Sequence, residues 1–130
     1  MQLRLELVTV PVSDVELAKA FYVDQVGFSV EQDVQVDADH RFVELLPPGS
    51  PCSIALTTGY VDSEPGSLQG VQVNVDELDK VHAFLHDRAV PVSEIQEYPW
   101  GRFCFFSDLD GNGWSVHEPP TREGWDAAGP

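Results

Sequence analysis

The sequence repeats itself at an interval of 63 residues, and this repeat restricts the possible folds more than any other feature. The alternating valines near the N-terminus recur from Val71 onward, and Phe84 follows Phe21 at the same interval. A repeat of this length is typical of a duplicated supersecondary unit and not of a solenoid. We therefore expect two related halves, at about residues 3–58 and 69–118.

Each half is predicted to consist of a strand, a helix and three further strands. Ser13 and Glu16 form a capping box, which predicts Ser13 as the N-cap of the first helix, and Gly27 predicts the end of that helix. Alternating or apolar runs predict the strands, and stretches rich in Pro, Gly and Asp predict the turns. The predicted strands cover residues 5–12, 28–35, 41–46, 52–58, 71–75, 90–97, 102–107 and 114–118. This order predicts an α+β fold in which two βαβββ half-repeats form curved mixed sheets around a cavity.

The alternation within the first strand of each half assigns its residues to two faces. The valines are expected to be buried under the helices, so the residues between them must face the other way. These other residues are Leu7, Thr9, Gly70, Gln72 and Asn74. Two curved sheets with such mixed faces turned inward would enclose a pocket for a small molecule.

Length and composition predict one globular domain, residues 1–118, followed by a flexible tail at 119–130 that is rich in Pro, Gly and Ala. No apolar run is long enough to span a bilayer, and the N-terminus alternates like a strand and does not resemble a signal peptide. The two cysteines, Cys52 and Cys104, lie far apart in apolar-rich stretches. That usage is typical of buried, reduced thiols, and we therefore expect a cytoplasmic protein.

The chain is strongly acidic, with 22 Asp and Glu residues against 7 Lys and Arg and a formal charge of −15. Such a chain repels nucleic acid and anionic membrane surfaces, so neither is expected as a partner. The charge would attract a cationic ligand. The alternative is that the charge only keeps the protein in solution.

Three stretches carry a resemblance to a known family. They are VPVSDVELAKAFYVDQVGF (residues 10–28), VQVNVDELDKVHAFL (71–85) and FFSDLDGNGWSVHE (105–118). With these stretches in this order, the chain resembles the vicinal oxygen chelate superfamily, which includes glyoxalase I, extradiol dioxygenases, fosfomycin-resistance enzymes and bleomycin-binding proteins. The resemblance spans about residues 3–118 and implies a glyoxalase-like fold. It also implies a dimer, and a symmetric homodimer is expected.

The resemblance further implies where a divalent metal would be held. In the metal-binding members, His or Glu residues from separate strands hold the metal and leave a position open for substrate. The matching positions here are Leu7, Ala55, Gly70 and Ser115. Three of these residues have no donor atom in the side chain, and a neutral Ser hydroxyl is a poor ligand. We therefore expect no metal ligand and no cofactor, and the resemblance does not transfer glyoxalase or dioxygenase activity.

His117 is the candidate titratable group of the expected pocket, because it lies two residues after Ser115 and shares its side of the strand. The alternative is a structural histidine at a strand end. Ser115 and His117 stand roughly 6.5 Å apart on the strand, which is too far for a nucleophile and its base. His82 and His86 are spaced i, i+4 on the second helix without a third ligand, and His40 lies in an acidic turn, so none of these is predicted to bind a metal.

These observations favour a metal-independent small-molecule binding protein of the glyoxalase/bleomycin-resistance type, with a cationic or aromatic antibiotic as candidate ligand. Phe103 alternates with its neighbours on the penultimate strand and is a candidate wall of the pocket. The candidate binding residues are Leu7, Thr9, Gln72, Asn74, Phe103, Ser115 and His117.

Two other functions stay open. The first is a lyase or isomerase acting on a small carbonyl compound, with His117 as the catalytic base and Asn74 or Gln72 stabilising an oxyanion. The second is an assembly module whose pocket is filled by its own side chains. The sequence does not identify the ligand.

Overall fold

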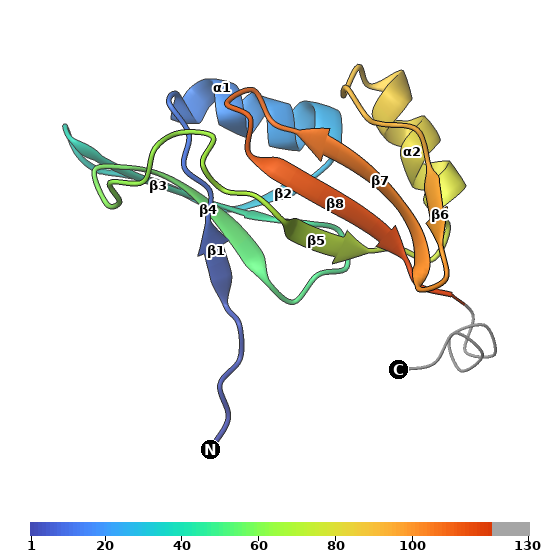
Figure 1. The fold of residues 1–130 in the computed structure, drawn as a ribbon. Coiled ribbons are helices and arrows are strands. Elements are labelled where there is room, and N and C mark those ends of the chain that lie inside the picture. Colours follow the sequence, from blue (N-terminus) through green and yellow to red (C-terminus); the bar gives the residue numbers. More distant parts are fainter. Residues whose placement is uncertain (121–130) are drawn as a thin grey trace. The chain divides into compact units, whose positions relative to one another are not determined.

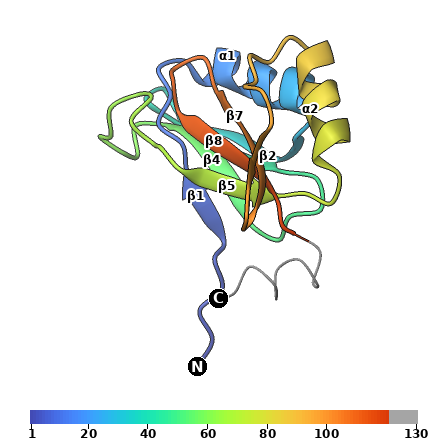
Figure 2. The same cartoon turned by 45° about the vertical axis from the view of Figure 1, so that its right-hand side comes forward.

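The computed structural model describes residues 1–120, and their contacts divide into two compact units, each with one four-stranded sheet (Figures 1 and 2). The first unit comprises Met1–Leu68 and Asp108–Asn112, and the second comprises Gln69–Ser107 and the chain from Gly113 onward. The predicted α+β class and the βαβββ order of each half are confirmed. Of the predicted tail, residues 121–130 lie outside the described residues.

The first unit has the strand order β1-β4-β3-β2, with β1 parallel to β4 and the other pairs antiparallel. The α-helix α1 continues into a π-helical segment, η1. The elements are β1 (Leu7–Thr9), α1 (Val15–Ala20), η1 (Phe21–Val26), β2 (Ser29–Asp37), β3 (His40–Leu46) and β4 (Ser53–Thr58). Gly27 ends the helical stretch with a φ of 91°, in the left-handed region that favours glycine, so the predicted stop is confirmed.

The predicted N-cap of the first helix is wrong by one residue. Asp14, and not Ser13, caps α1, and its carboxylate accepts a hydrogen bond from the amide of Leu17 at 3.0 Å. The hydroxyl of Ser13 instead donates to Asp110 at 2.6 Å. The motif therefore identified the start of the helix, but the Ser13 hydroxyl bonds to Asp110 and the next residue, Asp14, caps the helix.

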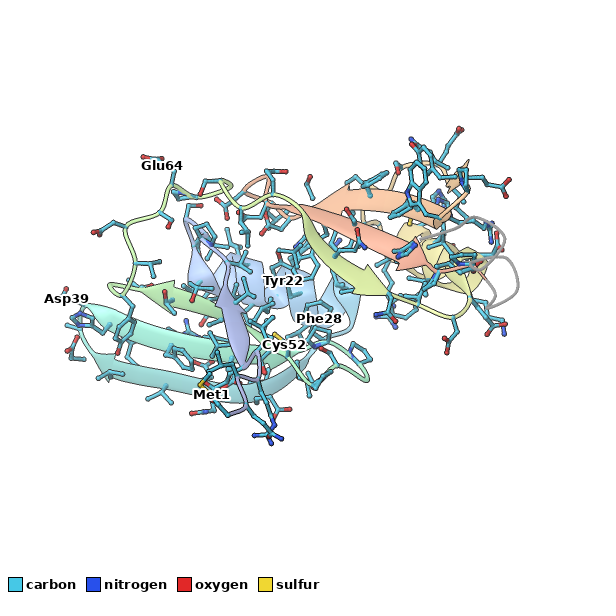
Figure 3. All side chains as sticks on the ribbon, turned by 60° about the horizontal axis from the view of Figure 1, so that its bottom comes forward. Met1, Tyr22, Phe28, Asp39, Cys52 and Glu64 are labelled. Atoms are coloured by element: carbon cyan, nitrogen blue, oxygen red, sulfur yellow. The ribbon has the colours of Figure 1, made fainter. Side chains whose placement is uncertain are left out.

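The turn Asp108–Asn112 is built into the first unit through buried hydrogen bonds. The hydroxyl of Tyr22 donates to Asp108 at 2.7 Å, and the side-chain amide of Asn112 donates to the carbonyl of Pro11 at 2.7 Å. Tyr22 also stacks on Phe28, with ring centroids 5.5 Å apart, and the two lie next to each other in Figure 3. The sequence predicted only a turn at this place. The structure makes it part of the core of the first unit.

The second unit has the strand order β5-β8-β7-β6, with β5 parallel to β8 and the other pairs antiparallel. Leu78 and Leu85 are the buried residues of its helix, whereas Val81 is only partly buried. The elements are β5 (Val71–Asn74), α2 (Leu78–Asp87), β6 (Gln96–Tyr98), β7 (Gly101–Ser107) and β8 (Gly113–Glu118).

The predicted strand at residues 90–97 is largely wrong, because β6 begins only at Gln96. Val92 makes a single bridge to Phe106, and the hydroxyl of Ser93 accepts a hydrogen bond from the amide of Phe105 at 2.9 Å. Pro91 has no amide hydrogen to donate to a ladder. A side-chain hydrogen bond and an isolated bridge thus replace continuous pairing in this stretch.

Both cysteines are free thiols, as predicted, but only Cys104 is fully buried, and Cys52 is half-buried. Burial raises the pKa of the Cys104 thiol. None of the helices in residues 1–120 is long and apolar enough to cross a membrane.

Candidate ligand-binding face

One face of the second sheet points away from α2 and brings together the second-half residues predicted to bind a ligand. Directly paired residues of neighbouring strands point to the same side of a sheet. The paired rows across β5, β8 and β7 are Gln72–Ser115–Phe105 and Asn74–His117–Phe103. On β6, Gln96 pairs with Phe103 and Tyr98 pairs with Gly101. We call this surface, with Trp100 of the β6–β7 turn, the aromatic face; it comprises Gln72, Asn74, Gln96, Tyr98, Trp100, Phe103, Phe105, Ser115 and His117.

The rings on the aromatic face contact one another in a continuous series. Tyr98 stacks on Trp100, with centroids 5.1 Å apart and planes 11° apart. Phe103 meets Tyr98 edge-on at 5.7 Å and lies parallel to Phe105 at 6.2 Å. The imidazole of His117 stacks on Phe103 at 4.3 Å. Such stacked and edge-on pairs stabilise one another and form an ordered surface.

Three of these aromatic side chains remain exposed in the described chain. The exposed fractions are 52% for Trp100, 42% for Tyr98 and 39% for Phe105. A contiguous exposed apolar patch is a feature that marks interaction sites on soluble proteins. Exposed ring faces held by neighbouring rings can stack on a planar ligand with little loss of side-chain entropy.

The aromatic face carries no Lys, Arg, Asp or Glu side chain among its residues. Arg102 is on β7, like Phe103 and Phe105, but it points to the side of the sheet that faces α2. There its guanidinium donates to Asp79 at 3.0 Å and to Glu118 at 3.3 Å. This contact holds the pKa of Asp79 below its usual value. Glu118 also accepts a hydrogen bond from the amide of Leu78 at 2.7 Å, at the start of α2. The one arginine of this hairpin is therefore engaged by carboxylates on the helix side of the sheet.

A hollow of about 580 Å³ opens at the end of the sheet where β6 turns into β7. Tyr98 of the aromatic face also lines this hollow, as does Gly101, with which Tyr98 pairs. Its other lining residues are Val75, Asp76, Glu97, Arg102, Glu118, Pro119 and Pro120. Carboxylates outnumber the single guanidinium there, so the hollow favours cationic or uncharged groups over anions.

Leu7 and Thr9, the first-half candidates, lie on β1 of the first unit. They pair with Ser53 and Ala55 of β4. Val8, between them, shares its side of the sheet with Arg41, whose guanidinium forms an ion pair with Glu16 of α1. The register thus places Leu7 and Thr9 on the face opposite α1, as the alternation predicted. Their part in binding a ligand stays a prediction.

The four positions at which the family resemblance implies metal ligands do not fit a divalent metal. Leu7, Ala55 and Gly70 have no side-chain donor, and Ser115 offers only a hydroxyl next to the ring of Phe105. Within residues 1–120, no group of three or more His, Cys, Asp or Glu side chains is arranged to hold a metal ion. Function without a metal nevertheless stays a prediction.

The other histidines make local contacts within their own units. His82 lies with Nε2 3.0 Å from the carbonyl of Ser93, and His40 contacts Asp37 at 2.8 Å. His86 is highly exposed, with Asp87 at 3.7 Å. These partners account for His82 and His40 as structural groups.

Sequence reasoning selected Phe103 but missed four members of the aromatic face, namely Gln96, Tyr98, Trp100 and Phe105. Strand alternation already sets Phe103 and Phe105 on one side, against Arg102, Cys104 and Phe106, but only Phe103 was selected as a binding residue. Tyr98 fell beyond the end of the predicted strand at 90–97, and Trp100 lies in a turn, where no periodicity indicates the direction of a side chain.

The family model described as Glyoxalase/Bleomycin resistance protein/Dioxygenase superfamily matches residues 4–116. The structure of TnmS3, an antibiotic binding protein from Streptomyces sp. CB03234, matches with 38% identity and a TM-score of 0.83, over 92% of this chain and 98% of that one. No curated protein matches the chain.

Two further solved structures are similar along most of their length. A glyoxalase/bleomycin resistance protein from Streptomyces sp. CB03234 is 38% identical, with a TM-score of 0.77, over 88% of this chain and 99% of its own. A member of the same superfamily from Sphaerobacter thermophilus DSM 20745 is 32% identical, with a TM-score of 0.80, over 90% of this chain and 98% of its own.

Proposed function

Because this chain belongs to the Glyoxalase/Bleomycin resistance protein/Dioxygenase superfamily, we propose that it binds a planar aromatic small molecule on the aromatic face and leaves that molecule chemically unchanged. The observation that carries this proposal is the continuous series of rings from Trp100 to Phe105, of which three remain exposed. A flat ring system laid on such a surface gains stacking and apolar burial together.

The charges around the aromatic face support an uncharged or cationic ligand. The face itself carries no charged side chain, and Arg102 is engaged by Asp79 and Glu118 on the other side of the sheet. The chain as a whole carries a formal charge of −15. An anionic ligand would therefore be repelled without a local cation to hold it.

The exposed amides of β5 support a ligand with polar groups at the edge of its rings. Gln72 and Asn74 lie beside Ser115 and His117 in the paired rows, next to the phenyl rings. Amide side chains can both donate and accept hydrogen bonds. An antibiotic with fused aromatic rings has this chemistry, and the similarity to TnmS3, described as an antibiotic binding protein, supports an antibiotic as the ligand, which would be sequestered and not modified.

A panel of compounds that differ in charge and planarity tests the proposal by equilibrium dialysis. It comprises 9-aminoacridine (planar and cationic), acridone (planar and uncharged), anthracene-9-carboxylate (planar and anionic) and 1-adamantanamine (cationic but not planar). We expect saturable binding of the first two and affinity lower by about tenfold or more for the anion. Binding of 1-adamantanamine as tight as that of 9-aminoacridine would show attraction by charge alone. Failure of either 9-aminoacridine or acridone to bind saturably would reject the proposal.

The remaining parts of the proposal concern metal, assembly and location. We propose that binding needs no metal, because the four implied ligand positions lack suitable donors. We also propose that the protein is a homodimer, as the family resemblance implies, and that it is cytoplasmic, as its cysteine usage predicts. The enzymatic alternative, with His117 as a general base, stays a prediction. No contact of His117 favours a role as a base over a role in binding.

A further inference from the structure

The imidazole of His117 makes a hydrogen bond that fixes which of its nitrogens carries the proton. Nε2 lies 3.0 Å from the backbone carbonyl oxygen of Trp100. A carbonyl oxygen can only accept, so Nε2 must donate. In a neutral imidazole the lone pair is then on Nδ1.

Gly101 makes room for this arrangement. Its φ of 137° lies in the region that favours glycine, and a Cβ atom at this position would strike Nε2 of His117 and lie 2.9 Å from Cδ2 of the same ring. The Nε2–Cδ2 edge of the imidazole therefore faces the β6–β7 turn. Nδ1 lies across the ring from Cδ2, away from Gly101, and no described residue hydrogen-bonds to it.

His117 joins two parts of the aromatic face. Its ring stacks on Phe103 of β7 with planes 9° apart, and its Nε2–H donates a hydrogen bond to the carbonyl of Trp100 in the turn. The indole of Trp100 stacks in turn on Tyr98, which meets Phe103 edge-on. The imidazole of His117 on β8 thus contacts the Phe103 ring within this series and the backbone of Trp100 at one end of it.

We propose that His117 is a positioning residue of the aromatic face, which anchors the β6–β7 turn through Nε2–H and leaves Nδ1 as an acceptor for the ligand. The proposal rests on the proposed function in its second part only, because the anchoring concerns the protein without ligand. It adds a requirement on the ligand, which must carry an N–H or O–H group at the edge of its ring system to use Nδ1.

Imidazole nitrogen NMR of the unmodified protein tests the anchoring without any substitution. Long-range proton–nitrogen correlations distinguish a protonated nitrogen from one that carries a lone pair. In the neutral form of His117 we expect Nε2 to be protonated and Nδ1 to be unprotonated. The opposite tautomer, or fast averaging of the two, would overturn the proposal, because the bond to Trp100 would then not be held.

Two variants separate the hydrogen bond from the ring. His117→Phe keeps an aromatic ring beside Phe103 but has no donor, whereas His117→Gln has an N–H donor that can reach the Trp100 carbonyl but no ring. We expect the backbone amide hydrogens of Trp100 and Gly101 to exchange with solvent about fivefold faster in H117F than in the unmodified protein. In H117Q we expect these exchange rates to change little. Unchanged exchange in H117F, or equal acceleration in both variants, would contradict anchoring through Nε2.

The role of Nδ1 is tested with acridone and N-methylacridone, which differ in one N–H group. We expect the unmodified protein to bind acridone about tenfold more tightly, and H117F to lose this preference. A preference that persists in H117F would overturn the acceptor role. If neither compound binds the unmodified protein, the proposed function and the acceptor role fail together, while the nitrogen NMR and the exchange rates still decide the anchoring.

Discussion

Replacing Asn112 by alanine is expected to lower the free energy of unfolding by about 2–4 kcal/mol. The side chain is 1% exposed and makes three hydrogen bonds in the first unit. Its amide nitrogen donates to Pro11 at 2.7 Å and to Asp108 at 2.8 Å, and its oxygen accepts from the amide of Leu68 at 3.1 Å. Alanine removes all three of these hydrogen bonds, leaves the partly buried amide of Leu68 without this acceptor and opens a small void, and these effects destabilise the folded chain.

Asn74 provides the matched control, because it is exposed on β5 and no side-chain hydrogen bond is recorded for it among the described residues. Asn74→Ala is expected to change the free energy of unfolding by less than about 0.5 kcal/mol. Urea unfolding followed by circular dichroism measures both variants. Equal stability of the two variants would mean that Asn112 is not part of a buried network, and that the turn Asp108–Asn112 is held by other contacts.

Replacing Phe105 by alanine is expected to weaken binding of 9-aminoacridine by about tenfold, within the range for loss of one stacking ring. Phe105 lies parallel to Phe103 and is 39% exposed, so its removal takes away ring surface with little change to the core. The measurement is fluorescence titration of the ligand with the purified variant.

Phe84 of α2 is a control of the same residue type and nearly the same exposure, at 40%. It lies on the helix, where the guanidinium of Arg88 is 4.3 Å from its ring, and it is not part of the aromatic face. Phe84→Ala is expected to bind 9-aminoacridine as tightly as the unmodified protein. Loss of affinity to the same degree in both variants would show that binding does not depend on the aromatic face.

The repeat in the sequence predicted the fold, and strand alternation predicted which residues of each strand share a side. The period of two grouped Gln72 with Asn74, and Ser115 with His117, and it separated Phe103 from its neighbours. The register of β5, β8 and β7 then places these residues on one side of the sheet. This works because strand alternation is a local property of the backbone, which pairing with a neighbouring strand preserves. The binding roles of these residues are still predictions.

Three features could not be predicted because they depend on contacts that no local sequence pattern contains. Ser13 is an excellent N-cap residue by local rules, yet it bonds to Asp110, 97 residues away. Asn112 looks like an ordinary turn residue, and only the carbonyl of Pro11 reveals its buried role. Likewise, the direction of Trp100 is set by its stacking on Tyr98 and by the bond from His117, neither of which a local pattern contains.

Titration of nitrogen-15-labelled protein with 9-aminoacridine tests the central claim most directly, because it shows where a planar ligand binds. If the aromatic face is the binding site, the largest saturable amide shifts will fall on β5, β7 and β8 at Asn74, Phe103, Phe105, Ser115 and His117. The amides of α2 and of β3 are expected to shift little. Saturable shifts centred on α2 or on the first unit, with the aromatic face unaffected, would contradict the claim.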